Sequence, residues 1–233
     1  MSLVEVEGLV VRYGSVTALE GVSLSVAAGE MVALVGANGA GKSTLLKALS
    51  GVVRAAGGRI RVDGRLSHVP EGRQLFPDLT VEDNLRLGAF RSRERDPSWL
   101  YQLLPELERT RRQRAGTLSG GQQQMVAIGR GLMSRPDVLA IDEMSLGLAP
   151  LVVRQLALIL TELNRQSGLA VLLVEQNVRL AFSLCSRGYL LETGAIVTSG
   201  STADLAQSPL VKDAYLGSAA KGTFLDGAGE AAP

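Results

Sequence analysis

A glycine-rich run that ends in lysine and two hydroxyl residues is the stretch of this sequence best suited to chemistry. It occupies residues 36–44 and reads G-A-N-G-A-G-K-S-T. Glycines allow successive backbone N–H groups to turn inward around phosphate groups, and the start of a following helix adds partial positive charge. Lys42 would reach the β- and γ-phosphates, and the Ser43 hydroxyl would ligate Mg²⁺, so the run predicts a nucleoside triphosphate site. The residues expected to form it are Gly36, Ala37, Asn38, Gly39, Ala40, Gly41, Lys42, Ser43 and Thr44.

A pair of carboxylates, Asp142 and Glu143, follows the apolar run Val138–Ile141. In a nucleoside triphosphatase, Asp142 suits a water-mediated contact with Mg²⁺, and Glu143 suits the general base that orients the attacking water. The simpler alternative is that both carboxylates only cap a strand. The phosphate-binding run favours the catalytic interpretation.

A third polar cluster, Glu175-Gln176-Asn177, ends the apolar run that begins at Ala170. Buried strands that end in polar residues often deliver those residues to a site, so Gln176 is a candidate for the same chemistry. A glutamine amide donates a hydrogen bond to phosphate or holds a water molecule, but it does not relay protons near neutral pH. A catalytic role and a plain strand cap both remain open for Gln176.

Buried parallel strands are the elements expected to position these groups. Met31–Val35, Val138–Ile141 and Ala170–Val174 are short apolar runs, and each ends in a polar or glycine-rich cluster. Such runs, separated by helical patterns, indicate the parallel sheet of an α/β fold. Residues 150–167 have apolar positions at helical spacing between a proline and a glycine, which predicts a covering helix. Shorter strands are expected at residues 3–6, 9–11 and 58–62.

The chain is expected to form one domain, residues 1–217, whose sheet-forming core comprises residues 1–76 and 137–217. Between these parts, residues 77–136 lack strand-like runs and contain a cluster of arginines, which predicts an inserted helical subdomain. Residues 218–233 are rich in glycine and alanine, which predicts a disordered tail.

The composition limits the class of protein. Of 233 residues, 46% are hydrophobic and only 4% aromatic, so the core must be mainly aliphatic. With 24 basic and 23 acidic residues, nothing marks the whole chain as a nucleic-acid binder. The single cysteine, Cys185, excludes an internal disulfide and agrees with a reducing compartment. The sequence has no signal-peptide pattern and no apolar run near the roughly 20 residues of a membrane span, so we expect a soluble, intracellular chain.

The run Leu118-Ser119-Gly120-Gly121-Gln122-Gln123-Gln124 adds the most specific pattern. Ser119 is a good helix N-cap, but two consecutive glycines are poor helix formers, so capping alone is a weak explanation. Together with the phosphate-binding run, this stretch resembles the signature of ABC ATPases, and the resemblance extends from about residue 3 to 217. It implies the α/β fold of P-loop NTPases with an N-terminal antiparallel β subdomain and an inserted helical subdomain.

The resemblance also implies ATP and Mg²⁺ as ligands and a head-to-tail dimer as the working unit. Each ATP would lie between the phosphate-binding run of one subunit and the signature of the other. The signature residues are Ser119, Gly120, Gly121 and Gln122. Tyr13 matches the family's aromatic residue that stacks on adenine. Glu71 replaces the glutamine of most members and would ligate Mg²⁺ directly or through water.

Three shorter motifs narrow the resemblance to one subtype. Glu71-Gly72-Arg73, Ser145 to Pro150 and Val174 to Asn177 together resemble the ATP-binding subunits of branched-chain amino-acid importers. Gln176 stands where most ABC ATPases carry a histidine that contacts the γ-phosphate, and the only histidine here, His68, lies in a different segment. By resemblance, Gln176 is then a γ-phosphate sensor and Glu143 the base. The segment before Glu71 is shorter than is usual in the family, which leaves its packing open.

These patterns predict an ATP-hydrolysing subunit that powers a membrane importer of branched-chain, hydrophobic amino acids. The expected partners are a second ABC ATPase subunit (the same or a paralogous chain), two membrane-spanning permease subunits and an external substrate-binding protein, with no nucleic acid. The expected location is peripheral, on the cytoplasmic face of the inner membrane. The alternatives are the ATPase of a lipid or polysaccharide exporter, an importer of amides or urea, and a non-transport ABC ATPase that acts on nucleic acid or ribosomes.

Overall fold

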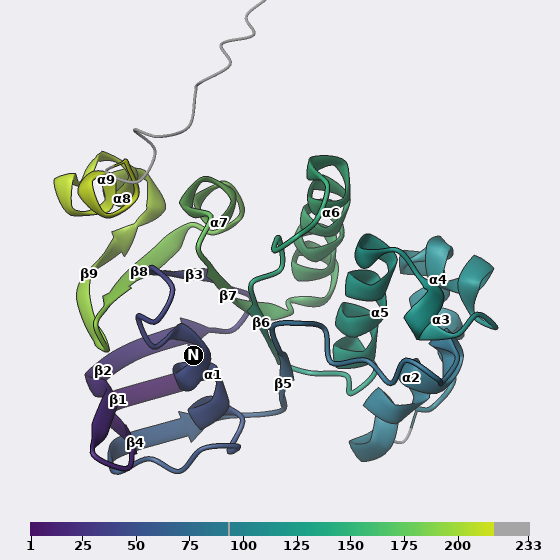
Figure 1. Ribbon diagram of the computed structural model, residues 1–233, viewed down its shortest axis with the longest axis horizontal. Coiled ribbons are helices and arrows are strands. Elements are labelled where there is room, and N and C mark those ends of the chain that lie inside the picture. Colours follow the sequence, from purple (N-terminus) through teal and green to yellow (C-terminus); the bar gives the residue numbers. More distant parts are fainter. Residues whose placement is uncertain (93, 217–233) are drawn as a thin grey trace, which may run out of the picture.

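Two β-sheets form the framework of the protein (Figure 1). The computed structural model describes residues 1–92 and 94–216, so the tail expected at 218–233 lies outside the described residues. The smaller sheet is antiparallel and has the order β2-β1-β4. Its strands are β1 (Ser2–Tyr13), β2 (Val16–Ala27) and β4 (Gly57–Val62).

The larger sheet has six strands in the order β5-β6-β7-β3-β8-β9, and every pair except β8–β9 is parallel. The strands are β3 (Met31–Val35), β5 (Leu66–Val69), β6 (Val138–Asp142), β7 (Ala170–Glu175), β8 (Arg187–Glu192) and β9 (Ala195–Ser201). Every residue of β3, β6 and β7 is buried. A parallel sheet covered on both faces needs such continuous apolar strands. The carboxyl ends of β6, β7 and β3 therefore lie side by side at one edge.

The two faces of the larger sheet contribute to two different hydrophobic clusters. Met31, Ala33 and Val35 of β3 belong to one cluster, and Val32 and Leu34 belong to the other, as the two-residue period of a strand requires. The first cluster contains α5 (Gly120–Leu132), α6 (Pro150–Ser167) and α7 (Val178–Leu184). The second contains α1 (Lys42–Leu49) and the antiparallel sheet. The phosphate-binding run thus leads from the sheet into a helix that is packed between the two sheets.

Helices also occupy the segment between β5 and β6. They are α2 (Val81–Gly88), α3 (Ser98–Leu103), α4 (Pro105–Thr110) and α5, with 3₁₀ turns at Ala89–Arg91 and Ala115–Thr117. Figure 1 shows them grouped at one end of the molecule, beyond β5 and β6. The buried Asn84 of α2 holds the loop that leads into these helices. Its side chain accepts from Phe76 N at 3.0 Å and donates to Phe76 O and Thr80 O, each at 3.0 Å.

The structure differs from the sequence-based expectation at the N-terminus, and it shows the packing of the segment before Glu71, which the sequence left open. The two short strands expected at 3–6 and 9–11 form one continuous strand, β1. Gly8, with a φ of 56°, lies between them at a shift in the pairing register with β2, and the strand continues past it instead of turning. The shortened segment before Glu71 forms β5, which pairs with β6 along its whole length. The helix expected at 150–167 is α6, and Gly168 ends it with a φ of 67°.

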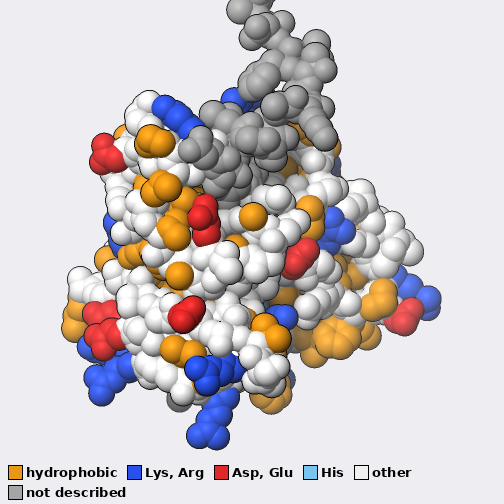
Figure 2. Space-filling model, turned by 60° about the vertical axis from the view of Figure 1, so that its left-hand side comes forward, with side chains coloured by type: hydrophobic (Ala, Val, Ile, Leu, Met, Phe, Trp, Pro, Cys, Tyr) orange, Lys and Arg blue, Asp and Glu red, His pale blue; other side chains and the backbone are white. Residues whose placement is uncertain are grey.

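The last two helices, α8 (Thr202–Gln207) and α9 (Pro209–Leu216), follow β9. On the face shown in Figure 2, acidic, basic and hydrophobic side chains of the described residues are interspersed. Within residues 1–92 and 94–216, no helix is long and apolar enough to cross a membrane.

Candidate nucleotide-binding site

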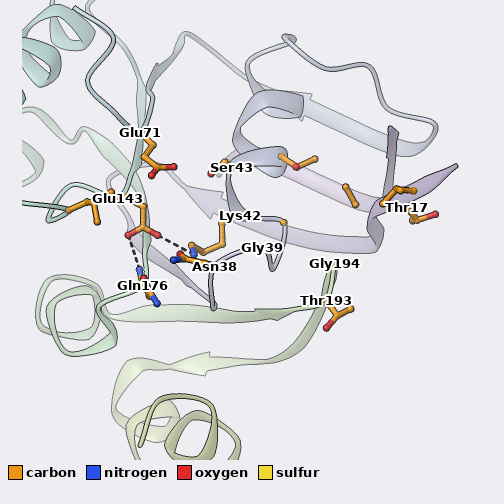
Figure 3. Close-up of a pocket in the computed structure, with 15 residues that line it drawn as sticks. Thr17, Asn38, Gly39, Lys42, Ser43, Glu71, Glu143, Gln176, Thr193 and Gly194 are labelled. Carbon is orange, nitrogen blue, oxygen red and sulfur yellow. Dashed lines mark hydrogen bonds and ion pairs between the residues drawn. The ribbon is translucent and has the colours of Figure 1, made fainter. Parts of the chain in front are cut away.

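A cavity of about 440 Å³ opens where the phosphate-binding run meets the carboxyl ends of the parallel strands (Figure 3). Its volume is within the range of small-molecule sites. Residues from both sheets and from several loops line it: Val16, Thr17, Ala18, Asn38, Gly39, Gly41, Lys42, Ser43, Thr44, Glu71, Glu143, Leu146, Gln176, Thr193 and Gly194. The structure thus brings together the phosphate-binding run, Glu143, Gln176 and Glu71, which are far apart in the sequence.

The phosphate-binding run wraps tightly around the start of α1. Gly41 has a φ of 108°, and a Cβ added there would lie 2.8 Å from Ala18 O, so only glycine fits without a shift. Ala40 O accepts a hydrogen bond from Gly194 N at 2.9 Å, which ties the run to the β8–β9 turn. Such a loop ahead of a helix N-terminus is suited to bind phosphate oxygens.

Lys42 is the cation at the centre of this cavity. Its side chain is only 5% exposed, and its ammonium donates to Gly36 O at 2.7 Å and to Ala37 O at 3.1 Å. A third contact, to Glu143 Oε1 at 3.1 Å, pairs it with the carboxylate expected to act as the base. Figure 3 shows these two side chains pointing toward each other. Phosphate oxygens placed at Lys42 would compete with Glu143 for the same ammonium.

Glu143 lies just beyond the end of β6 and is held from two sides. Its backbone N donates to Val174 O at 2.9 Å, and its Oε2 accepts from Gln176 N at 3.2 Å. The partner is the backbone of Gln176 rather than its amide, which leaves the exposed side chain of Gln176 free to face the cavity. Glu143 has a φ of 52°, an uncommon conformation for a residue other than glycine.

Asp142 is the last residue of β6 and is almost fully buried. Burial raises the pKa of its carboxyl group, and Glu143 and Glu71 raise it further, whereas Ser43 and Lys42 act in the opposite direction. Its Oδ1 is buried without a hydrogen-bond partner. A buried carboxylate oxygen of this kind needs a cation or a donor.

The residues present fit a bound Mg²⁺. A second cavity of about 200 Å³ shares Ser43 and Glu71 with the first. Asp142 is also among the residues that line it, and the side chains of these three residues are hard oxygen donors. Within the described residues, no group of three or more His, Cys, Asp or Glu side chains forms a metal site. Mg²⁺ is usually held by one or two carboxylates together with substrate phosphates, so this donor set is of the expected type.

Several lining residues were not predicted from the sequence, namely Val16, Thr17, Ala18, Leu146, Thr193 and Gly194. They come from β2, from the turn after β6 and from the β8–β9 turn, and only the folded sheets bring these segments together. Tyr13, which was expected to stack on adenine, ends β1 opposite Val16 and is 47% exposed. It is not among the residues that line the cavity.

The signature run caps α5, away from the phosphate-binding run of the same chain. Ser119 Oγ accepts from Gln122 N at 3.3 Å, and Gln122 Oε1 accepts from Ser119 N at 3.0 Å, which is a capping box. Gln122 Nε2 also donates to Glu106 Oε1 of α4 at 3.0 Å. Ser119, Gly121 and Gln122 line a separate cavity of about 550 Å³ between α4, α5 and α6.

Comparison with known proteins agrees with the resemblance to ABC ATPases. Residues 19–145 match the family model described as ABC transporter. The chain is 47% identical over 223 residues to the high-affinity branched-chain amino acid transport ATP-binding protein BraG of Pseudomonas aeruginosa, covering 88% of this chain and 95% of that protein. It is 31% identical to the lipopolysaccharide export system ATP-binding protein LptB of Haemophilus influenzae, covering 93% of this chain and 98% of that protein.

A solved nucleotide-free ATP-binding cassette from an ABC transporter superposes with a TM-score of 0.82 at 25% identity, covering 92% of this chain and 99% of that chain. The chain belongs to the ABC transporter family. Within that family it is an ATP-binding subunit, and its enzymatic activity is ATP hydrolysis coupled to transport.

Proposed function

We propose that this chain is the ATP-hydrolysing motor of a membrane importer for branched-chain, hydrophobic amino acids. The observation that supports this choice of transported substrate is the 47% identity to BraG, which extends over 95% of that protein. The motif combination Glu71-Gly72-Arg73, Ser145 to Pro150 and Val174 to Asn177 points in the same direction. Cargo does not follow from the fold, because other chains of a transporter bind it.

The proposed domain comprises residues 1–217, with a core of 1–76 and 137–217 and a helical subdomain at about 77–136. The helices α2 to α5 support this division, because they are the elements between β5 and β6. The proposed ATP site is the cavity of about 440 Å³, with the run 36–44 on the phosphates. We keep Tyr13 as the proposed adenine contact, since it lies one hairpin turn from Val16 and Thr17 of the cavity wall.

Binding of ATP is proposed to begin at the phosphate-binding run. The buried Lys42 ammonium and the N-terminus of α1 provide the positive potential that the β- and γ-phosphates need. Mg²⁺ would be held by Ser43 directly, by Asp142 through water and by Glu71. The metal would neutralise charge on the β- and γ-oxygens.

Hydrolysis is assigned to Glu143 and Gln176. When phosphate oxygens bind the Lys42 ammonium, they replace Glu143 Oε1 as its partner. Glu143 Oε1 can then accept a hydrogen bond from the attacking water. Gln176 N continues to hold Glu143 Oε2, so the carboxylate keeps its direction. The Gln176 amide is proposed to donate to the γ-phosphate or to hold the water.

The proposed working unit is a head-to-tail dimer with a second ABC ATPase subunit, in which Ser119 to Gln122 of each chain meet the ATP bound to the other. The signature supports this arrangement because it caps a helix whose N-terminus lies outside the cavity of its own chain. Two permease subunits and an external substrate-binding protein would complete the importer. The chain would then be peripheral, on the cytoplasmic face of the inner membrane.

The test is uptake of labelled leucine by cells that lack this chain. Plasmids restore either the wild type or Lys42→Ala, and unlabelled valine, urea and an amide compete with the label. We expect uptake to return only with the wild type and valine to compete best. If the deletion leaves uptake unchanged, branched-chain amino acids are not the transported substrate and an exporter is favoured. The ATPase assignment would stand in that case.

A further inference from the structure

The mechanism leaves one buried carboxylate without a role. Glu175, the last residue of β7, has 0% of its surface exposed, although it lies between Val174 and Gln176, which both hold Glu143. A carboxylate at such a depth is costly unless its oxygens are hydrogen-bonded. Both oxygens of Glu175 are therefore expected to accept hydrogen bonds from specific groups of the protein.

Both oxygens of Glu175 bind the same residue on the neighbouring loop. Ser145 N donates to Oε1 at 2.9 Å, and Ser145 Oγ donates to Oε2 at 2.8 Å. Burial raises the pKa of Glu175 to about 7, and the two bonds from Ser145 act in the opposite direction. The contact joins the end of β7 to the turn that follows β6, and it involves no residue of the phosphate-binding run.

The turn that Glu175 holds contains two residues of the nucleotide cavity. Leu146 N donates to Glu143 O at 3.3 Å, which closes a turn around Ser145, and Leu148 N donates to Ser145 O at 3.2 Å. Glu143 has a positive φ, which persists only where surrounding contacts impose it. Ser145 lies two residues after Glu143, inside the turn that the Leu146–Glu143 bond closes, and the Glu175 side chain holds it there.

We propose that Glu175 is a positioning residue for ATP hydrolysis, which clamps Ser145 and so aims Glu143 and Leu146 into the nucleotide cavity. This inference rests on the proposed role of Glu143 as the base. Residues 174, 175 and 176 then act as one unit: Val174 O holds the Glu143 backbone, Gln176 N holds its carboxylate, and Glu175 holds the turn beyond it.

The test compares steady-state ATP hydrolysis by purified full-length variants. Glu175→Ala removes both bonds, whereas Glu175→Gln keeps one acceptor for Ser145 N and offers a donor to Ser145 Oγ, so it should preserve the clamp. We expect kcat to fall at least about tenfold in Glu175→Ala with KM for ATP within about twofold, because misplacement of a catalytic group by a fraction of an ångström costs rate rather than binding. Glu175→Gln should stay within about threefold of the wild type.

Thr202→Val is the matched control. It removes another buried hydrogen bond, from Thr202 Oγ1 to Cys185 O at 2.8 Å, in α8 and outside the cavity, so it should leave kcat unchanged. Ser145→Ala removes one of the two clamp bonds by truncating a partly exposed hydroxyl, and it covers the case in which Glu175→Ala does not fold. Its kcat should fall by about threefold or more at unchanged KM.

The inference is overturned if Glu175→Ala, or Ser145→Ala in its place, hydrolyses ATP as fast as Thr202→Val. It is also overturned if Glu175→Gln loses as much activity as Glu175→Ala. Glu143→Gln is assayed alongside: if it is inactive while Glu175→Ala is fully active, the clamp is wrong and the proposed function stands. If Glu143→Gln keeps wild-type activity, the proposed base itself is wrong.

Discussion

At the scale of single residues, the backbone and the side chain of Gln176 have separable roles. Gln176 N donates to Glu143 Oε2, while the Gln176 side chain lines the nucleotide cavity. An alanine at 176 keeps the backbone donor and removes only the amide. The chemical role of the side chain can therefore be measured without loss of the contact that orients Glu143.

Gln176→Ala is expected to lower kcat for ATP hydrolysis about 10- to 100-fold, because it removes one polar group that contacts the γ-phosphate or the water. ATP affinity, measured by fluorescence of a labelled nucleotide, should change little. Gln207→Ala, at an exposed glutamine at the end of α8, serves as the control. Wild-type hydrolysis by Gln176→Ala beside an inactive Glu143→Gln would reduce Gln176 to a strand cap.

The buried Glu175 also predicts how stability depends on pH. Burial raises its pKa from 4.5 to about 7, so between these values the folded state holds more protons than the unfolded chain. Its contribution to the free energy of unfolding is thus fully present below about pH 4.5 and is lost as the pH rises through about 7. Glu175→Gln removes this titration, and the wild type should lose up to about 3 kcal/mol more than the variant between pH 5 and 8.

Urea unfolding of both proteins at pH 5 and pH 8 measures this difference. Other titrating groups, including the partly buried His68 whose pKa is lowered by desolvation, are common to both proteins and cancel. The same pH dependence in the wild type and in Glu175→Gln would show that Glu175 keeps an ordinary pKa in the folded state.

At the scale of elements, α2 packs very closely on α5, the helix that begins at the signature residues. A Cβ added at Gly88 would lie 1.9 Å from Arg130 O, a contact that no side-chain rotation relieves. Gly88→Ala should therefore destabilise the protein by about 2 kcal/mol or more, although alanine favours a helix by about 1 kcal/mol. Gly200→Ala in β9, where nothing lies within 4 Å of the added Cβ, should be nearly neutral. Equal urea midpoints for the two variants would contradict this packing argument.

The elements also explain which parts of the site could be predicted from the sequence. Gly36 to Thr44, Asp142 and Gln176 directly follow apolar runs, and a strand end is visible in the local pattern. The β8–β9 turn is different, because it reaches the cavity only through the pairing of β3 with β8, which joins segments more than 150 residues apart. The contact of Glu175 with Ser145 likewise depends on β6 and β7 being neighbours, which no local pattern specifies.

At the scale of the whole molecule, the two motifs proposed to bind ATP lie in different places on one chain. The phosphate-binding run lines the proposed nucleotide cavity, whereas Ser119 lines the separate cavity between α4, α5 and α6. A single chain therefore presents half of the proposed catalytic site on each of two surfaces. Two chains related by a two-fold axis, with the phosphate-binding run of each facing the signature of the other, would join these halves twice, because each contact of a two-fold interface occurs twice.

This arrangement predicts complementation between two inactive variants of the purified full-length chain. Lys42→Ala loses the phosphate contact and Ser119→Arg blocks the signature, so each pure protein should hydrolyse almost no ATP. In a mixed dimer, the intact phosphate-binding run of Ser119→Arg faces the intact signature of Lys42→Ala and forms one complete site. An equal mixture should therefore recover about a quarter of wild-type hydrolysis, because half of the dimers are mixed and each has one active site of two. Phosphate release by the mixture that stays at the level of the separate variants would mean that this chain does not pair head-to-tail with itself, and a paralogous partner would have to supply the second signature.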